Sequence, residues 1–265
     1  ETGLEFSCDR LIIATGTYLS SQIIIGPQRW PGGPHNQRSA IGLSDSLRQM
    51  GIPLRRLQTA TPPRVHRGSL HFERMQELPG DPDAGGFLWE HRQRKLDRQF
   101  SCFLTFTTDA TIDAVRRNLP NSPLVLGNIT NEGPKHCPSI DRKVINFPNI
   151  GKHQIFIEPE GEDTVEMYLQ GLTTSMPAEA QREILHTVPG LEDAHILRYG
   201  YAIEYDALAP GSIHKTMASR SLEGLYTAGQ LNGTSCYEEA AAQGLLAGIN
   251  AANSLLGKPA FRPSR

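Results

Sequence analysis

A cysteine held in a turn of proline and glycine is the side chain whose surroundings best suit covalent chemistry. Cys137 lies in the segment GPKHCPS, where Gly133, Pro134 and Pro138 favour an irregular loop. Four basic residues surround it in sequence: Lys135, His136, Arg142 and Lys143. If they are also close in space, their charge lowers the pKa of the thiol, which makes Cys137 a candidate nucleophile. The alternative is a structural cysteine beside a basic turn.

Two short apolar strands, one near each end of the chain, are expected to provide a second site. The run DRLIIATG ends on Thr15 and Gly16, and the run LYTAG ends on Gly229. Buried strands that end on glycine indicate a parallel sheet whose carboxyl edge receives a ligand. Together with the expected helices, they predict an α/β fold, doubly wound or three-layered, that is interrupted by an insert.

A helix of small residues is expected after the second strand, beginning near Tyr237 and ending before Gly257. Gly244 and Gly248 lie four residues apart, so a sheet or a flat ligand can approach one face of this helix closely. The acidic first turn, 238–239, suits the helix dipole but repels a pyrophosphate. An electron-accepting ring such as a flavin fits that end better. The alternative is a tightly packed crossover helix without a ligand.

Two basic stretches are candidates for RNA contact. The chain of 265 residues has a formal net charge of -2, so attraction for RNA has to come from a local patch. The second stretch spans 91–98. The first is free of acidic residues and contains Arg55, Arg56, Arg64, His66 and Arg67. The alternative is that both stretches are solvated loop charges.

The composition predicts a globular chain with a packed core, since 38% of the residues are hydrophobic. The cysteines form no C-x-x-C pair, which argues against a zinc site or a disulfide framework and favours a reducing compartment. For the same reason we expect no metal site. We also expect no membrane-spanning segment, because the sequence has no run of about 18 apolar residues. The first residues look like part of a strand or turn within a domain, so we expect the chain to be a fragment of a longer protein.

Several further elements are expected from local signals. Ser44 is expected to cap a helix that Gly51 ends. The Pro62–Pro63 pair is expected to form a rigid, exposed turn. Residues 68–99 are polar and rich in proline and glycine, which predicts a mobile loop.

Order is expected to return in the strand FSCFLTFTT, which begins at residue 100. Its alternation places four side chains on a buried face: Phe100, Cys102, Leu104 and Phe106. Helices are expected over 110–118 and 178–187, and the segment YGYAIEYDAL reads as a strand.

Four longer motifs carry a resemblance to a known family. They are GPKHCPSIDRKV, HQIFIEPEG, RYGYAIEYD and TAGQLNGTSCYEEAAAQGLLAGINAA. In this order they resemble the MnmG/GidA family of flavoproteins, which modify the wobble uridine of certain tRNAs. The resemblance covers essentially the whole chain.

The resemblance implies an enzyme that uses FAD, NADH, methylenetetrahydrofolate and an amine to install an aminomethyl-type group at C5 of the wobble uridine. It also implies tRNA and an MnmE-type GTPase as partners, a homodimer without membrane association, and a location in the bacterial cytoplasm or the mitochondrial matrix. Cys137 corresponds to the cysteine of the family's GPRYCPS motif, and Gln230 corresponds to a family FAD contact.

The site residues that follow from the motifs fall into three groups. The expected flavin-side residues are Thr15, Gly16, Gly229, Gln230, Asn232 and Gly233. The residues expected to contact the nicotinamide cofactor are Gly133, Pro134, Lys135, His136 and Ser139. The residues expected to contact RNA are Arg55, Arg56, Arg64 and Arg67.

The implied fold is an α/β, FAD-binding, three-layer domain that is Rossmann-like and of the glutathione-reductase type. It is expected to be incomplete and interrupted by a mixed α+β insert. Residues 1–57 and 196–257 are assigned to the FAD domain and 258–265 to a tail. Residues 58–195 are assigned to the insert on the substrate and nicotinamide side, with the mobile loop near 68–99.

The sequence also departs from the family pattern. No G-x-G-x-x-G motif precedes a helix, Ala60 stands where the family usually has glycine, and Ser235–Cys236 stands where Thr-Gly is usual. Two alternatives stay open. One is a non-catalytic derivative of the fold that binds RNA or a partner. The other is a folate- and FAD-dependent tRNA uracil methyltransferase of the TrmFO group, against which the EPEG and YEEAAAQG stretches argue.

Overall fold

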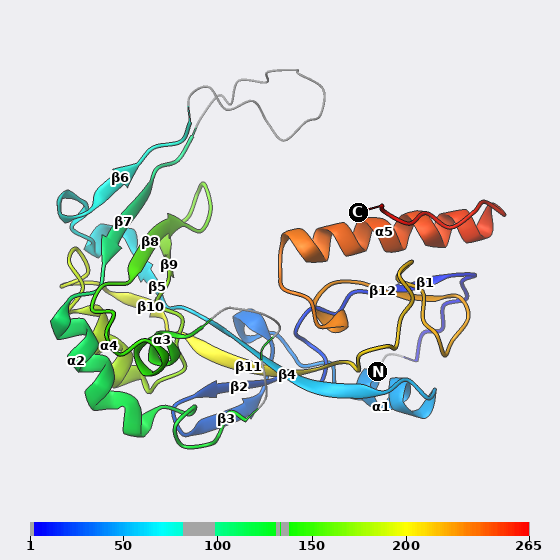
Figure 1. Cartoon of the computed structure of the whole chain (residues 1–265), viewed down its shortest axis with the longest axis horizontal. Helices are drawn as coiled ribbons and strands as arrows, with labels where there is room; N and C mark the ends of the chain where they lie inside the picture. Colours follow the sequence, from blue (N-terminus) through cyan, green and yellow to red (C-terminus); the bar gives the residue numbers. More distant parts are fainter. Residues whose placement is uncertain (1–2, 82–98, 131–132, 134–137, 265) are drawn as a thin grey trace.

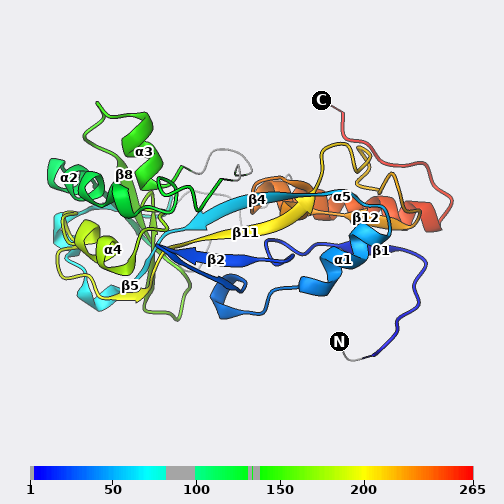
Figure 2. The ribbon, with the colours of Figure 1, turned by 90° about the horizontal axis from the view of Figure 1, so that it is seen from below.

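The computed structural model describes residues 3–81, 99–130, 133 and 138–264. Within these residues the chain forms two lobes, and the long strands β4 (Leu54–Thr61) and β11 (Tyr201–Leu208) run between them (Figures 1 and 2). The strands form three sheets, one parallel and two antiparallel.

The parallel sheet pairs the two ends of the chain. It consists of β1 (Leu11–Ile13) and β12 (Leu225–Thr227), with Leu11 opposite Leu225 and Ile13 opposite Thr227. Helix α5 (Glu238–Leu255) packs over this pair through a small buried cluster: Tyr226, Ala228, Ala247 and Ala251. The parallel pair and the α/β fold class are therefore confirmed.

The second sheet joins the lobes. Its strand order is β3 (Gln28–Pro31), β2 (Gln22–Ile25), β11 and β4, and every neighbouring pair is antiparallel. The pairing of β4 with β11 is continuous over eight residues, from Thr61 opposite Tyr201 to Leu208 opposite Leu54. Helix α1 (Ile41–Gln49) lies between β3 and β4 in sequence.

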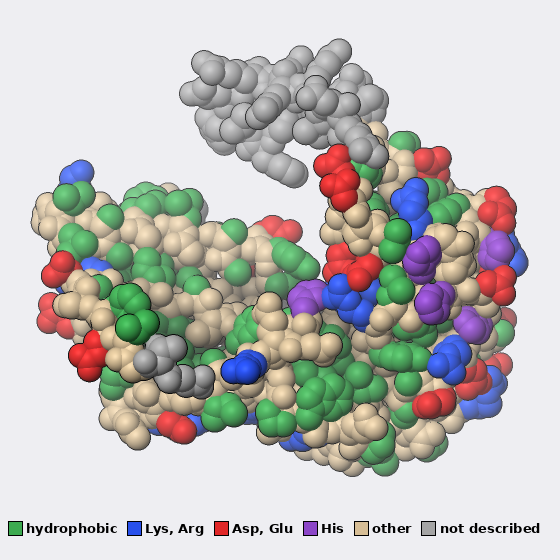
Figure 3. Space-filling model, turned by 180° about the vertical axis from the view of Figure 1, so that it is seen from behind, with side chains coloured by type: hydrophobic (Ala, Val, Ile, Leu, Met, Phe, Trp, Pro, Cys, Tyr) green, Lys and Arg blue, Asp and Glu red, His purple; other side chains and the backbone are tan. Residues whose placement is uncertain are grey.

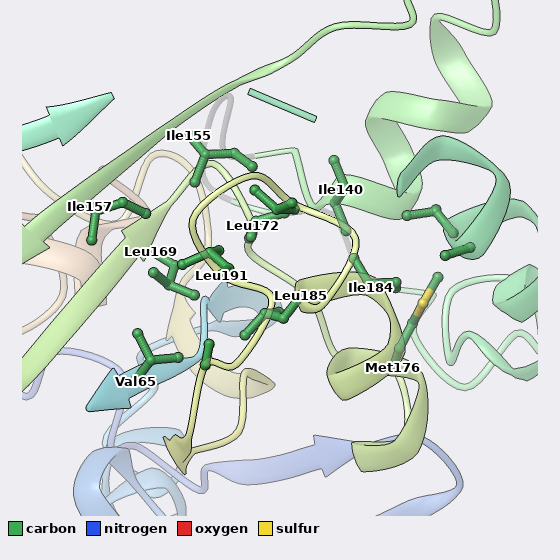
Figure 4. Close-up of a cluster of buried hydrophobic side chains, with 14 of the residues drawn as sticks. Val65, Ile140, Ile155, Ile157, Leu169, Leu172, Met176, Ile184, Leu185 and Leu191 are labelled. Atoms are coloured by element: carbon green, nitrogen blue, oxygen red, sulfur yellow. The ribbon is translucent and has the colours of Figure 1, made fainter. Parts of the chain in front are cut away.

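The third sheet belongs to the other lobe, and its neighbouring strands are antiparallel. Its order is β10 (Ile196–Arg198), β5 (Arg64–His66), β9 (Glu166–Gln170), β8 (Gln154–Pro159), β7 (Cys102–Phe106) and β6 (Gln76–Leu78). Three helices pack against it: α2 (Asp109–Asn118), α3 (Ile140–Asn146) and α4 (Ala178–Leu185). Sheet and helices share one buried apolar cluster, in which Val65, Ile155 and Leu169 meet Ile140 and Ile184 (Figure 4).

Five short 3₁₀ helices complete the described secondary structure: Pro34–Asn36, Arg67–Ser69, Phe72–Arg74, Leu119–Asn121 and Gly229–Asn232. None of the described helices combines the length and the apolar character needed to cross a membrane.

The start of α1 differs from the prediction. The helix begins at Ile41, so Ser44 lies within it as a buried residue and does not cap it. The Ser44 hydroxyl instead accepts a hydrogen bond from the hydroxyl of Ser20 at 2.7 Å. Gly51, with φ of 76°, follows the helix end as expected. Long-range contact with Ser20 thus outweighs the local capping preference of serine.

Two segments expected to be irregular are packed in the structure. Pro62 and Pro63 are buried where the chain passes from β4 into β5, so the prediction of an exposed turn was wrong. Within the expected loop 68–99, residues 76–78 form β6, which pairs with β7. The prediction of a loop was therefore wrong for this part, because backbone pairing compensates for a polar sequence. Residues 82–98, which include the second basic stretch, lie outside the described residues.

Strand β7 is confirmed, but its faces are exchanged relative to the prediction. Thr105 is buried, and Phe103 packs on the apolar cluster with its ring centroid 4.4 Å from that of Phe72. Phe100, on the opposite face, is 38% exposed. Apolar side chains occur on both faces of this strand, so alternation alone could not select the inner face.

Candidate functional site

A cavity of about 230 Å³ lies at the edge where the two antiparallel sheets approach the loop before α5. Residues 59–61 of β4 and Tyr201 and Ile203 of β11 form one side. Gln230 and residues 235–237 form another. We call this space the edge cavity. Cys236, which is exposed, is part of its lining.

The ends of β1 and β12 bring the expected flavin-side residues to one edge. The amide of Ala228 donates to the carbonyl of Ile13 at 3.1 Å, which holds the two strand ends level. Gly229 has φ of 78° and its amide donates to the Gln243 side chain at 3.1 Å. Gln230 lines the edge cavity. Two strands from opposite ends of the sequence therefore supply neighbouring parts of one site.

Thr15 carries an unused hydrogen-bonding group at this edge. Its hydroxyl is buried and has no partner among the described residues. Gly16, directly after it, has φ of 56°, in the left-handed region that favours glycine. Buried hydroxyls nearly always have a hydrogen-bond partner, so a ligand or an ordered water is expected at Thr15.

Asn232 and Gly233 shape the loop between β12 and α5. The Asn232 side chain accepts from the Thr227 hydroxyl at 2.6 Å and donates to the Gln243 side chain at 2.8 Å. Gly233 has φ of 78°, and a Cβ there would lie 2.6 Å from a guanidinium nitrogen of Arg55. Asn232 thus ties the strand to the helix, and Gly233 allows the close approach of Arg55.

The first turn of α5 is acidic, as expected. The Glu239 carboxylate accepts from the Ser235 amide at 3.0 Å and also contacts the Thr234 hydroxyl. Tyr237, directly before the helix, has φ of 55°, which is uncommon for a residue with a side chain. A Cβ added at Gly244 or Gly248 would meet nothing within 4 Å, so the small-residue face is open among the described residues.

The turn 133–139 is described only at its ends. Pro134, Lys135, His136 and Cys137 lie outside the described residues. Gly133 lies against β4, because a Cβ there would be 2.9 Å from the carbonyl oxygen of Gln58.

The other end of the turn leads into α3, a helix that we did not expect. The Ser139 hydroxyl caps it by accepting from the Arg142 amide at 3.5 Å. Asp141 in its first turn is buried and accepts from the Ser122 hydroxyl at 2.6 Å. Lys143 donates to the carbonyl of Gly171 at 3.1 Å. In the structure, Ser139 therefore has a local role in the helix start.

Arg55 and Arg56 point to opposite sides of β4. Arg55 approaches Gly233, as described above. The Arg56 guanidinium pairs with the buried Asp206 at 3.1 Å and donates to the carbonyl of Ser20 at 2.8 Å. Arg48 reaches the same carboxylate at 2.8 Å. Arg56 is therefore engaged in a partly buried ionic network beneath the second sheet.

Arg64 and Arg67 lie on the other lobe, at β5 and just after it. Arg64 pairs with Glu160 at 3.0 Å and lies 4.5 Å from the ring centre of Tyr168. Burial opposes ionisation of Glu160, but the hydrogen bond and charge of Arg64 outweigh this effect and lower the pKa of the carboxyl. Arg67 is exposed and lies 5.3 Å from the ring centre of Phe72. The four predicted RNA contacts do not form one patch.

Sequence reasoning missed the residues between the two lobes. His35 and Tyr201 line the edge cavity, and burial raises the pKa of the Tyr201 phenol. Arg198 contacts His35 and pairs with Glu166 at 2.6 Å. The aromatic alternation of RYGYAIEYD was the signal that pointed to this region. No group of metal-ligating side chains occurs within the described parts of the chain.

Known proteins resemble the chain along its whole length. A family model described as "Glucose inhibited division protein A" matches residues 1–259. The tRNA uridine 5-carboxymethylaminomethyl modification enzyme MnmG of Geobacillus thermodenitrificans is 45% identical over 265 residues, covering 100% of this chain and 42% of that protein. The protein of the same name from Geobacillus kaustophilus is 46% identical over 264 residues, with 100% and 42% covered.

Solved structures agree with this result. Aquifex aeolicus GidA in its form I crystal superposes with a TM-score of 0.86 at 40% identity, over 96% of this chain and 43% of that chain. The form II crystal gives a TM-score of 0.85 at 38% identity, with 96% and 41% covered. The chain thus spans about two fifths of the length of these relatives. By sequence and by fold, it belongs to the glucose-inhibited division protein A (GidA) family.

Proposed function

We propose that this chain is the flavin-facing and substrate-facing part of a tRNA-modifying enzyme that depends on FAD. The reaction is the installation of an aminomethyl-type group at C5 of the wobble uridine. One observation carries the proposal: β1 and β12 bring Thr15 and Gln230 to the same edge, beside a cavity, in a chain of the GidA family. Two relatives carry the name of this tRNA uridine modification enzyme.

The residues present at this edge fit FAD. Thr15 offers a buried hydroxyl without a partner among the described residues, and Gln230 offers an amide at the cavity. The backbone at Gly16 and Gly229 has positive φ, which allows close approach to a ligand. We assign these four residues to flavin contact. When bound, FAD supplies the redox chemistry of the reaction.

Cys137 is the proposed nucleophile. Support comes from the described end of its turn, because Gly133 lies against Gln58 of β4 and the next residues of that strand, 59–61, line the edge cavity. A thiolate there either adds to C6 of uracil and makes C5 nucleophilic or assists the one-carbon intermediate. Lys135 and His136 supply positive charge next to it in sequence.

The family resemblance supports the remaining parts of the proposal. NADH is the proposed reductant, with the turn 133–147 on its side, and methylenetetrahydrofolate is the proposed one-carbon donor. The proposed partners are tRNA, an MnmE-type GTPase and a second copy of the chain. The proposed location is the bacterial cytoplasm or the mitochondrial matrix.

The decisive experiment replaces Cys137 with serine in the full-length parent protein. Cys137→Ser is expected to abolish wobble-uridine modification, measured by mass spectrometry of tRNA nucleosides, while the flavin content stays unchanged. Cys8→Ser is the matched control, because Cys8 is an exposed free thiol outside the edge cavity. Normal modified-nucleoside levels in the Cys137→Ser strain would remove this residue from the mechanism.

A binding experiment tests the flavin assignment without relying on activity. The 265-residue chain is expected to bind FAD weakly and to purify colourless, because it lacks a G-x-G-x-x-G phosphate motif. Thr15→Val and Gln230→Ala should weaken this binding further in a titration of flavin fluorescence. Unchanged affinity in both variants would contradict the assignment. A stoichiometric flavin absorbance band in the purified chain would contradict the expectation of weak binding.

A further inference from the structure

A second cavity, of about 180 Å³, lies between the β2–β3 hairpin and the strands β10 and β11. Three aromatic side chains line it: Trp30, Tyr199 and Tyr201. We call it the aromatic cavity. It shares His35, Arg64 and Tyr201 with the edge cavity, so the two cavities are neighbours with a common wall. A notch separates the two lobes, and basic, acidic and histidine side chains lie beside one another at its floor (Figure 3).

The charges around the aromatic cavity are balanced. The Arg64 guanidinium pairs with Glu160 at 3.0 Å, and the Arg198 guanidinium pairs with Glu166 at 2.6 Å. A phosphate would have to displace these carboxylates, whereas an uncharged ring would not. Stacking on aromatic side chains is how proteins hold unpaired nucleobases, since every base has a flat π-face. The cavity therefore suits an uncharged planar ring with polar edges.

The loop that closes the cavity has an unusual backbone. His35 and Asn36 both line the cavity and both have positive φ, 55° and 59°, which is uncommon outside glycine. Gly33 lines it too, and a Cβ there would lie 2.6 Å from ring atoms of Tyr18. Backbone strain of this kind persists where the surrounding structure imposes it and is frequent at ligand sites. Two consecutive strained residues therefore indicate that the surrounding structure imposes the shape of this wall.

We propose that the aromatic cavity binds a second, unpaired nucleobase of the RNA substrate, a direct neighbour of the nucleotide held at the edge cavity. This inference rests on the proposed function, in which the target uridine meets the flavin beside the edge cavity. Two consecutive nucleotides, with their bases splayed apart, would occupy the two neighbouring cavities. The ring faces of Trp30 and Tyr199 would stack on the second base, and the paired guanidiniums would border it.

Trp30 makes this proposal measurable. The sequence contains two tryptophans, Trp30 and Trp89, so a Trp89→Phe background leaves Trp30 as the single emitter. Titration of this chain with an unlabelled RNA pentamer that contains uridine is expected to quench the fluorescence of Trp30 until it reaches a plateau. A pentamer of the same length with abasic sites should quench far less. Quenching by FAD and not by the RNA pentamer would overturn the proposal and assign the cavity to the flavin.

Anisotropy of a labelled pentamer gives an independent reading. Trp30→Leu and Tyr199→Leu should each weaken binding roughly tenfold, the loss expected for one stacked base. Trp30→Phe should restore most of the affinity, because it keeps an aromatic face. Phe6→Leu is the matched control, since Phe6 is an aromatic residue 88% exposed outside the cavity and its replacement should change nothing. Unchanged affinity in folded Trp30→Leu and Tyr199→Leu would overturn the proposal.

The proposed function and this inference fail in different experiments. If the full-length parent makes no modified wobble uridine, the function is refuted, and the pentamer titration still reports whether the cavity takes a base. If Tyr199→Leu leaves tRNA affinity and modification of the parent unchanged, the cavity assignment is refuted and the function stands.

Discussion

The amide of Ala228 donates to the carbonyl of Ile13 at 3.1 Å, although the two residues lie near opposite ends of the chain. This hydrogen bond continues the parallel pairing of β1 with β12. It sets Thr15–Gly16 and Gly229–Gln230 side by side at one carboxyl edge. The whole candidate flavin site depends on this closure, because neither terminal segment contains it alone.

Asn232 is expected to stabilise that edge. Asn232→Ala removes hydrogen bonds to the Thr227 hydroxyl, the Thr227 carbonyl and the Gln243 side chain. Leaving such partly buried groups unpaired should lower the free energy of unfolding by about 1–3 kcal/mol. Urea denaturation measures the loss. Asn149→Ala, at an exposed position, is the control and should leave the midpoint unchanged.

Arg56 is expected to matter for stability more than for RNA binding. Arg56→Met removes one of the two arginines that pair with the buried Asp206 and leaves Arg48 as the other, and should cost about 1–3 kcal/mol. Arg116→Met, which breaks an exposed pair with Asp113, should cost less than about 1 kcal/mol. Thermal and urea unfolding compare the two. Equal stability of both variants would contradict the structural role of Arg56.

The Arg64–Glu160 pair is expected to make the free energy of unfolding depend on pH in the acidic range. Arg64 lowers the pKa of the Glu160 carboxyl below 4.5. The contribution of the ion pair to the free energy of unfolding is therefore fully present above pH 4.5. The contribution is lost as the pH falls through the lowered folded-state pKa, because the protonated acid no longer pairs. In Arg64→Met, the hydrogen bond and charge of Arg64 are lost while burial remains, so the pKa of Glu160 should rise relative to the unchanged chain. Carbon-detected NMR titration follows this carboxyl, and Arg116→Met should leave its titration unchanged.

Two glycines, one at the candidate flavin site and one inside α5, should respond to alanine in opposite ways. Gly248 lies in the interior of α5 and a Cβ there meets nothing within 4 Å, so Gly248→Ala should stabilise this chain by about 1 kcal/mol. Gly229 has φ of 78°, and Gly229→Ala should destabilise it by about 1–3 kcal/mol. Urea midpoints of the two variants should move in opposite directions. A gain from Gly229→Ala would contradict the positive-φ requirement.

The fold and part of the site could be predicted because their signals are local. Strands that end on Gly16 and Gly229 predicted the parallel pair, and the small-residue run after Tyr237 predicted α5. The cap of α1 could not be predicted, since Ser44 is held by Ser20 from another segment. The inner face of β7 depends on Phe72, which lies far from Phe103 in the sequence.

The charged residues were the least predictable part of the site. Sequence proximity grouped Arg55, Arg56 and Arg64 as one basic patch. The pleat of β4 turns the first two to opposite sides, and Asp206 and Glu160 reach Arg56 and Arg64 from segments far away in sequence. Which carboxylate neutralises which arginine is decided by the sheet register, and local composition does not contain it.

The pairing of β1 with β12 also sets an order of events during synthesis. Leu11 leaves the ribosome long before Leu225, its partner in the sheet. At about 5–20 residues per second, β1 waits on the order of 10–40 s before its partner strand exists. During that time the apolar run LII has no strand to pair with, whereas the β2–β3 hairpin can close at once. The edge formed by β1 and β12 is therefore completed late, after the sheets that pair earlier parts of the chain can already form.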